Sequence, residues 1–185
     1  MRNEIIIFCV LSVPIIYFSW HVIFNLNSHG FYRFLGWECI ALLFAINFKY
    51  WFTDVFSWNQ ILSWIFLVYT SYLVIAGVIL LKNLGKADHI TRSDDSLYNF
   101  EKTTELVDTG LYKFIRHPLY GSLIFLTWGI YFKHITSIAL LMISILATIL
   151  FYVTAKFDEK ECIQYFGEKY KNYMSRSKMF IPFIF

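Results

Sequence analysis

Two segments of this chain, residues 61–81 and 135–155, each run for 21 residues without a single charged side chain. The hydrocarbon core of a bilayer is about 30 Å thick, and about 20 apolar residues in an α-helix are enough to cross it. Hydrophobic residues make up 58% of the 185-residue chain and charged residues only 16%, a balance that excludes a soluble globular protein and a disordered one. The two segments therefore predict an all-α integral membrane protein.

Three further apolar segments complete a predicted set of about five transmembrane helices. Residues 5–24 have the length of a span, and residues 34–52 are apolar enough to cross the membrane despite a few polar positions. Residues 119–132 form a short helix of 14 residues, about 21 Å long at the helical rise. Because this helix is short, we expect the residues just before it to lie at membrane depth.

Glu38 is the one acidic residue inside these five apolar segments. A charged side chain in the middle of a membrane helix costs about 2.5–3.5 kcal/mol on insertion scales. We expect a polar partner on a neighbouring turn or helix, such as Asn47 or His21, to meet it.

The connection formed by Lys133 and His134 is so short that the fourth and fifth spans must form an antiparallel hairpin. With five spans, 13 of the 16 basic residues fall on the side that carries residues 82–116 and the tail. The positive-inside rule then places loop and tail in the cytoplasm, in a bacterial or archaeal cytoplasmic membrane or in the endoplasmic reticulum. The net charge of +3 is too small, and too close to the apolar spans, to indicate a nucleic-acid partner.

The second half of the chain carries the features that indicate function. Residues 82–116 form a 35-residue connection, longer than two helices require, and such loops usually carry function or are disordered. In the tail, the apolar side chains of Ile163, Phe166, Tyr170 and Tyr173 recur at the spacing of an amphipathic helix. We interpret residues 1–185 as a single domain, in which residues 1–81 supply three membrane helices and residues 82–185 form the site.

The start of the fourth helix is the densest group of polar residues beside an apolar span. Pro118 is preorganised for the first turn of a helix, so His117 lies at the amino-terminal end, where free backbone N–H groups favour an anion. A carboxylate or phosphate suits this position. The same residues also suit a plain helix start, with Arg116 and His117 extended to lipid headgroups.

A compound pattern links this helix start to the loop and the tail. It comprises Leu106-Val107-Asp108-Thr109-Gly110-Leu111-Tyr112, then Arg116-His117-Pro118-Leu119-Tyr120, then Asp158-Glu159, and finally Phe166-Gly167-Glu168-Lys169-Tyr170 with Tyr173. The pattern resembles the isoprenylcysteine carboxyl methyltransferase family of integral-membrane enzymes. The resemblance covers residues 84–185, and the first two helices match only as apolar spans.

The resemblance implies that S-adenosylmethionine is the cofactor and binds where the loop, the fourth helix and the tail meet. By the resemblance, the cofactor-binding residues are Thr104, Glu105, Leu106, Val107, Tyr112, His117, Pro118, Leu119, Tyr120 and Asp158. Arg92 aligns with a further polar contact. An acceptor that has to be deprotonated needs a base, for which Asp158, Glu159 and Glu38 are the candidates. We predict no metal site.

The implied acceptor is the carboxylate of an isoprenylated cysteine, a lipidated substrate that arrives laterally from the bilayer. Two departures from the family pattern bear on this acceptor. Thr154 stands at the substrate-orienting position, one turn before Asp158, where the family usually has an arginine, and Thr104 stands where it often has a histidine. The alternative acceptors are a phospholipid amine, a thiol, or the hydroxyl of a polyketide-type lipid.

Two other functional classes share part of the pattern. Membrane enzymes similar to sterol reductases, which use NADPH, also carry Arg-His-Pro-x-Tyr near a helix end. They typically have asparagine after the proline, where this chain has Leu119. A non-catalytic membrane protein that keeps the pattern only for folding is the other alternative, and lack of affinity for S-adenosylmethionine would favour it.

Overall fold

The computed structural model describes residues 2–88, 97–135 and 137–183. In these ranges the regular elements are all helical, and the only β contacts are isolated bridges. The α-helices are α1 (Arg2–Ser19), α2 (His29–Asn47), α3 (Trp58–Leu84), α4 (Pro118–Tyr131), α5 (Ile138–Phe166) and α6 (Glu168–Arg176). Two 3₁₀ turns, η1 (Phe48–Tyr50) and η2 (Gly110–Lys113), lie between them. The predicted all-α class is confirmed.

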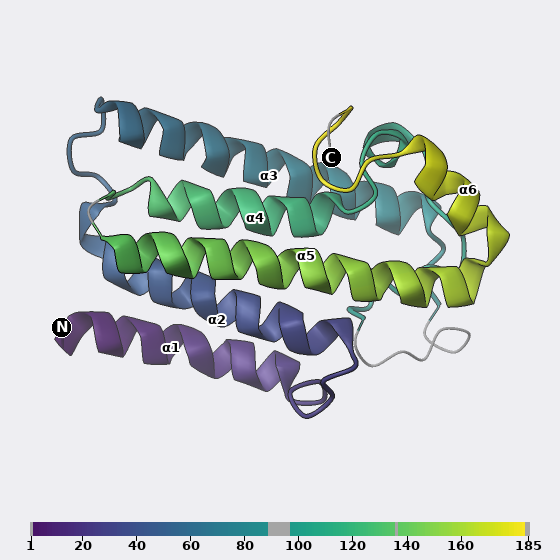
Figure 1. Ribbon diagram of the computed structural model, residues 1–185, viewed down its shortest axis with the longest axis horizontal. Coiled ribbons are helices and arrows are strands. Elements are labelled where there is room, and N and C mark those ends of the chain that lie inside the picture. The colour runs from purple at the N-terminus through teal and green to yellow at the C-terminus, as the bar shows by residue number, and fades with distance from the viewer. Residues whose placement is uncertain (1, 89–96, 136, 184–185) are drawn as a thin grey trace.

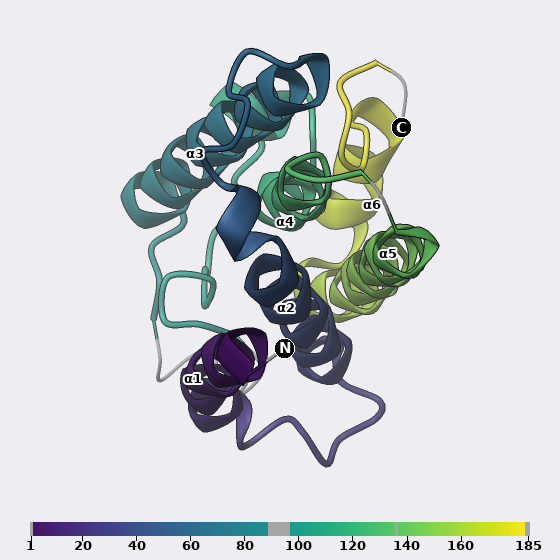
Figure 2. The same ribbon diagram turned by 90° about the vertical axis from the view of Figure 1, so that its left-hand side faces the viewer.

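The five long helices lie side by side along the longest axis of the molecule, and α6 lies across one end of them (Figure 1). Helix α4 packs against α3 and α5, while α2 packs against α5 and α1 against α2. Seen along the bundle, α4 lies between α3 and α5, and α1 lies at the outer edge (Figure 2). The loop before α4, the carboxyl-terminal half of α5 and α6 therefore meet at the same end.

Four helices in the described ranges are long and apolar enough to cross a membrane, namely α1, α2 with η1, α3 and α5. The protein is therefore a multi-pass membrane protein. Helix α4 forms almost where the sequence predicted it, but its 14 residues are fewer than the other four helices have. The count of five spans stays a prediction, because crossing by α4 depends on how the bilayer meets its short apolar stretch.

Helix α5 differs from the predicted tail. It continues past residue 155, the end of the predicted span, to Phe166, so the charged run from Lys156 to Glu161 is helical. Gly167, with φ +61°, then ends α5 and separates it from α6. The predicted amphipathic stripe is consequently divided, with its first half on α5 and its second half on α6.

Polar side chains inside the bundle form hydrogen bonds between neighbouring helices. Ser12 Oγ of α1 donates a hydrogen bond to Glu38 Oε2 of α2 at 2.7 Å. The expectation that Asn47 or His21 meets Glu38 is therefore wrong, because α1 packs alongside α2 and Asn47 Nδ2 instead donates to Ile130 O at 2.9 Å. Similar bonds to backbone carbonyls of α4 position that helix against α3, because a polar group in an apolar medium needs a partner.

Helices α2 and α5 approach closely at Gly36, where a Cβ atom would lie 2.6 Å from Cε1 and Cζ of the fully buried Phe151 ring. We expect Gly36→Ala to reduce the free energy of unfolding by about 1–3 kcal/mol, the typical cost of overpacking. Thermal unfolding in detergent measures the loss. Gly121→Ala is the matched control, since its Cβ would make only an ordinary contact at 3.7 Å. Equal melting temperatures for the two variants would contradict the close approach.

Candidate functional site

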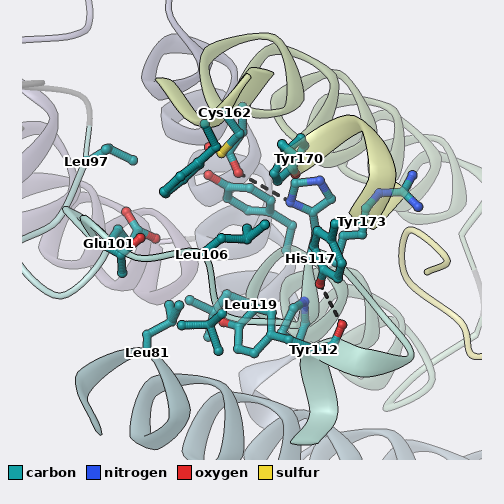
Figure 3. Close-up of a pocket in the computed structure, with 17 residues that line it drawn as sticks. Leu81, Leu97, Glu101, Leu106, Tyr112, His117, Leu119, Cys162, Tyr170 and Tyr173 are labelled. Atoms are coloured by element: carbon teal, nitrogen blue, oxygen red, sulfur yellow. Dashed lines mark hydrogen bonds and ion pairs between the residues drawn. The ribbon is translucent and has the colours of Figure 1, made fainter. Parts of the chain in front are cut away.

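A cavity of about 90 Å³ lies at the end of the bundle where the loop, α4, α5 and α6 meet (Figure 3). Eight of the ten sequence-predicted cofactor residues line it: Leu106, Val107, Tyr112, His117, Pro118, Leu119, Tyr120 and Asp158. The other two do not. Thr104 Oγ1 donates to Lys86 O at 2.7 Å, and Glu105 forms an exposed ion pair with Lys86. The structure thus brings most of the predicted site together around one space.

The start of α4 is joined to the tail by backbone hydrogen bonds. Pro118 is the first helical residue and His117 is the N-cap, as the sequence predicted. Arg116 N donates to Lys178 O at 2.8 Å, and His117 N donates to Met179 O at 3.1 Å. Because these bonds join the backbone before α4 to the backbone after α6, the positions of the Arg116 and His117 side chains are set by loop and tail together.

His117 is the centre of a buried charge network. Its Nδ1 lies 3.3 Å from Asp158 Oδ2 and its Nε2 lies 3.6 Å from Glu159 Oε1, and only 4% of the residue is exposed. Burial alone lowers the pKa of His117, but hydrogen bonding to Asp158 and Glu159 and their negative charge outweigh it and raise the pKa above its usual value. Positive charge is therefore favoured on His117, beside the two carboxylates.

Arg116 belongs to the same network and does not extend to lipid headgroups. Its Nε and Nη2 lie 2.9 and 2.7 Å from Glu159 Oε1, and its Nη1 donates to Ser177 O at 2.5 Å. Lys156 Nζ donates to the other oxygen of Glu159 at 2.9 Å. Arg116 and Lys156 thus both form ion pairs with the buried Glu159 carboxylate of the protein itself.

Four tyrosines, Tyr112, Tyr120, Tyr170 and Tyr173, line the cavity. Tyr173 lies across from Tyr112 and donates its hydroxyl proton to Tyr112 O at 2.6 Å (Figure 3). Burial raises the pKa of Tyr112, Tyr170 and Tyr173, so these phenols stay neutral. Neutral aromatic rings offer negative faces that attract a cation.

A second carboxylate faces the cavity from the loop. Glu101 lies on the opposite side of the cavity from His117 in Figure 3. Its Oε2 accepts hydrogen bonds from Arg33 Nη1 at 3.1 Å and from Tyr98 N at 2.9 Å, which fixes the carboxylate in place. With Asp158 on the far wall, the cavity presents acidic groups from two sides.

The predicted substrate-orienting position does not reach the cavity. Thr154 is fully buried in α5, and its hydroxyl donates to Leu150 O at 2.8 Å. Of the candidate bases, Asp158 lines the cavity, whereas Glu159 is bound by Arg116 and Glu38 lies against α1. Asp158 is thus the member of that set placed to contact a bound molecule.

Sequence reasoning missed several lining residues. Tyr170 and Tyr173 belonged to both the amphipathic stripe and the compound pattern, but neither was assigned to the cofactor. Glu101 stands in a polar loop with no pattern that separates it from its acidic neighbours. Arg92, the predicted further contact, lies outside the described residues. The remaining lining residues that were not predicted are Leu81, Leu97, Thr103, Arg116, Cys162 and Phe166.

Three curated relatives of the chain are named as methanethiol S-methyltransferases. A methanethiol S-methyltransferase from Crocosphaera subtropica is 24% identical over 186 residues, which cover 99% of this chain and 61% of the relative. A methanethiol S-methyltransferase from Pseudomonas deceptionensis is 31% identical, and methanethiol S-methyltransferase 1 from Bradyrhizobium diazoefficiens 33%, each over 72 residues or 39% of this chain. Those 72 residues cover 26% and 24% of these two relatives. The chain thus spans about 61% of the length of the first relative. No solved structure gives a significant match.

The sequence also matches a model of the family described as phospholipid methyltransferase, over residues 58–170. This range begins at the first residue of α3 and ends in α6, and it contains every residue that lines the cavity except Tyr173. The sequence-based recognition of a membrane methyltransferase is confirmed. Since the match covers more than half of a chain that carries several membrane helices, the protein belongs to the phospholipid methyltransferase family.

Proposed function

We propose that this enzyme transfers a methyl group from S-adenosylmethionine to the sulfur of a membrane-soluble thiol. The observation that carries the proposal is the pairing of the cations around the cavity. Arg116 and Lys156 both bind Glu159, and Thr154 replaces the arginine expected for orienting a carboxylate. Among the described residues that line the cavity, Arg116 is the only arginine or lysine and it is paired with Glu159, so a carboxylate acceptor would enter a partly dry site without one of these cations to meet it, which is costly.

A thiol avoids that cost because it arrives neutral. The pKa of an ordinary thiol is about 8.5, so it partitions into the bilayer and enters the site uncharged. The three curated relatives, all named methanethiol S-methyltransferase, support a sulfur acceptor. The isoprenylcysteine carboxylate, which the sequence resemblance favoured, therefore becomes the less favoured acceptor.

The chemistry of the cavity suits S-adenosylmethionine, which supplies an electrophilic methyl group on a sulfonium when it is bound. Asp158 and Glu101 suit its ammonium group and ribose hydroxyls, and the tyrosine faces suit the sulfonium. The amino-terminal end of α4 suits its carboxylate. The cavity of about 90 Å³ is smaller than the roughly 300–1,000 Å³ of typical ligand sites, so binding requires the loop and the lining side chains to move apart.

The enzyme contributes to the reaction by positioning the two reactants and by excluding water from them. The nucleophile has to stand in line with the methyl group, and holding two reactants in that geometry can supply much of the rate. Leu106, Leu119 and the tyrosines shield the reacting atoms from solvent, while Asp158 is placed to accept the acceptor's proton. Cytoplasmic orientation of this end, in the cytoplasmic membrane or the endoplasmic reticulum, is part of the proposal and follows from the basic residues of loop and tail.

A phospholipid amine is the second candidate acceptor. The carboxylates of Glu101 and Asp158 suit an approaching ammonium group, and the name of the family describes such a reaction. An amine must lose a proton before it attacks, and Asp158 is again the placed base.

The purified enzyme in detergent, incubated with methyl-labelled S-adenosylmethionine, distinguishes these acceptors. We expect labelled thioether from methanethiol and from a long-chain alkanethiol, at least about tenfold above the label transferred to farnesylcysteine analogue or phosphatidylethanolamine; such a ratio corresponds to about 1.4 kcal/mol between transition states. Asp158→Asn is the matched variant, and we expect it to transfer less labelled methyl group than the wild type. A labelled methyl ester on the farnesylcysteine analogue, with no thioether, would overturn the thiol proposal and leave the family assignment intact.

A further inference from the structure

Three potential metal ligands converge beside the cavity, on the side where α2 meets α5. His29 is the first residue of α2, and it is fully buried. Asp158 and Glu161, one turn apart on α5, point toward it, and one donor atom from each of the three residues lies within 4.8 Å of the others. The shortest of these separations joins His29 Nδ1 and Glu161 Oε2, at 2.6 Å.

Asp158 and Glu161 contact histidine side chains and are largely shielded from solvent. Glu159 binds Arg116 and Lys156, and Glu101 binds Arg33. Within the described residues, the ion-pair partner of Glu161 is the His29 imidazole, and Asp158 lies between His29 and His117. The side chains of Asp158 and Glu161 are only 15% and 24% exposed. Two shielded carboxylates thus lie beside a buried imidazole, unlike the side chains of a solvated acidic cluster.

We propose that His29, Asp158 and Glu161 bind one divalent transition metal ion, of the Zn²⁺ class. Imidazole nitrogen and carboxylate oxygen are ordinary zinc ligands, and catalytic zinc sites use three protein ligands with a fourth position left open. Bond lengths of about 2.0–2.2 Å in a tetrahedron place donor atoms roughly 3.3–3.5 Å apart. The present separations, from 2.6 to at most 4.8 Å, bracket that value, so side-chain rotation is sufficient to reach it.

The open position gives this site a role in the proposed thiol methylation, on which the inference rests. Asp158 lines the cavity, so a metal bound to it stands at the cavity wall. With a metal bound, Asp158 would act as its ligand and not as the base: a thiol bound to the metal would release its proton to solvent and become a thiolate, which is the nucleophilic form of sulfur. The thiolate sulfur then forms a bond to the methyl carbon as the bond from that carbon to the sulfonium sulfur breaks, which yields a thioether and S-adenosylhomocysteine.

Metal content measured on the purified protein tests the site without reference to activity. We expect about one Zn²⁺ per chain after expression in zinc-supplemented medium and purification without chelators. His29→Ala and Glu161→Gln should each weaken zinc binding by at least ~100-fold, more than loss of a supporting residue causes. Neither residue lines the cavity, so both variants should still bind S-adenosylmethionine, which reports that they are folded. Glu168→Gln, on the exposed face of α6, is the control that retains the metal.

Cobalt substitution identifies the geometry and the open position. Co²⁺ in this site should give intense visible bands of a four-coordinate ion, and added methanethiol should add a sulfur-to-metal charge-transfer band. Cys162, whose Sγ lies 3.8 Å from Asp158 Oδ1, is replaced by serine so that the new band reports only the added thiol. Equal metal content in wild type and His29→Ala would overturn the site. Full thiol methylation by metal-free wild-type enzyme would also overturn it, while leaving the proposed function standing.

Discussion

Replacement of Arg116 by methionine is expected to reduce the free energy of unfolding by about 3–5 kcal/mol, the largest single effect that this structure predicts. The variant leaves the buried Glu159 carboxylate without the guanidinium that contacts it at 2.7 and 2.9 Å. It also removes the donor to Ser177 O and so loosens the tail. Thermal unfolding in detergent, followed by circular dichroism, measures the loss.

Two further variants test whether the loss of stability comes from the Arg116–Glu159 ion pair or from the removal of any basic residue. Lys113→Met removes an exposed cation three residues away and should change stability by less than about 0.5 kcal/mol. Arg116→Met combined with Glu159→Met removes both charges and should recover most of the loss, because a buried pair replaced by apolar side chains is often neutral. If the double variant were no more stable than Arg116→Met alone, the ion pair would not be the cause.

His117→Ala is expected to weaken S-adenosylmethionine binding by about 10- to 150-fold. Loss of a charge-assisted hydrogen bond costs about 1.5–3 kcal/mol, and His117 is the residue that holds Asp158 in place against the cavity at 3.3 Å. Without the imidazole, Asp158 loses that partner and the start of α4 loses its buried N-cap side chain. Isothermal titration of the detergent-solubilised variant measures the affinity directly.

His134→Ala is the matched control for this measurement. His134 is stacked on Tyr50 at the opposite end of the bundle, with ring centroids 3.6 Å apart. Its replacement should leave cofactor affinity unchanged. Wild-type affinity in a folded His117→Ala protein would show that the start of α4 does not bind the cofactor.

The parts of the fold that depend on local pattern were predictable from the sequence. Uncharged apolar runs predicted the membrane helices, and Pro118 marked the start of α4 correctly. The continuation of α5 to Phe166 was not predicted, because the predicted membrane span ended at residue 155, where the charged run begins. The helix continues there, with an ion pair between Lys156 and Glu159, one turn apart, and it ends where Gly167 adopts a positive φ.

Contacts between distant segments were harder to predict, because sequence spacing does not say which helices are neighbours. The pairing of Ser12 with Glu38 depends on α1 lying beside α2, and the approach of His29 to Glu161 depends on α2 lying beside α5. The position of Glu101 across the cavity from His117 depends on the path of a loop without regular structure. The resemblance placed eight of the predicted residues at the cavity without this knowledge.

The backbone pairing of residues 114–117 with residues 178 and 179 sets the order in which the site can form. Synthesis proceeds from the amino terminus at about 5–20 residues per second, so the membrane helices are already inserted when residue 179 is added. The start of α4 can pair with residues 178 and 179 only after residue 179 has left the ribosome. A chain interrupted before this point can be a fully inserted membrane protein and still lack the backbone hydrogen bonds that hold the start of α4, so insertion alone does not show that the site has formed.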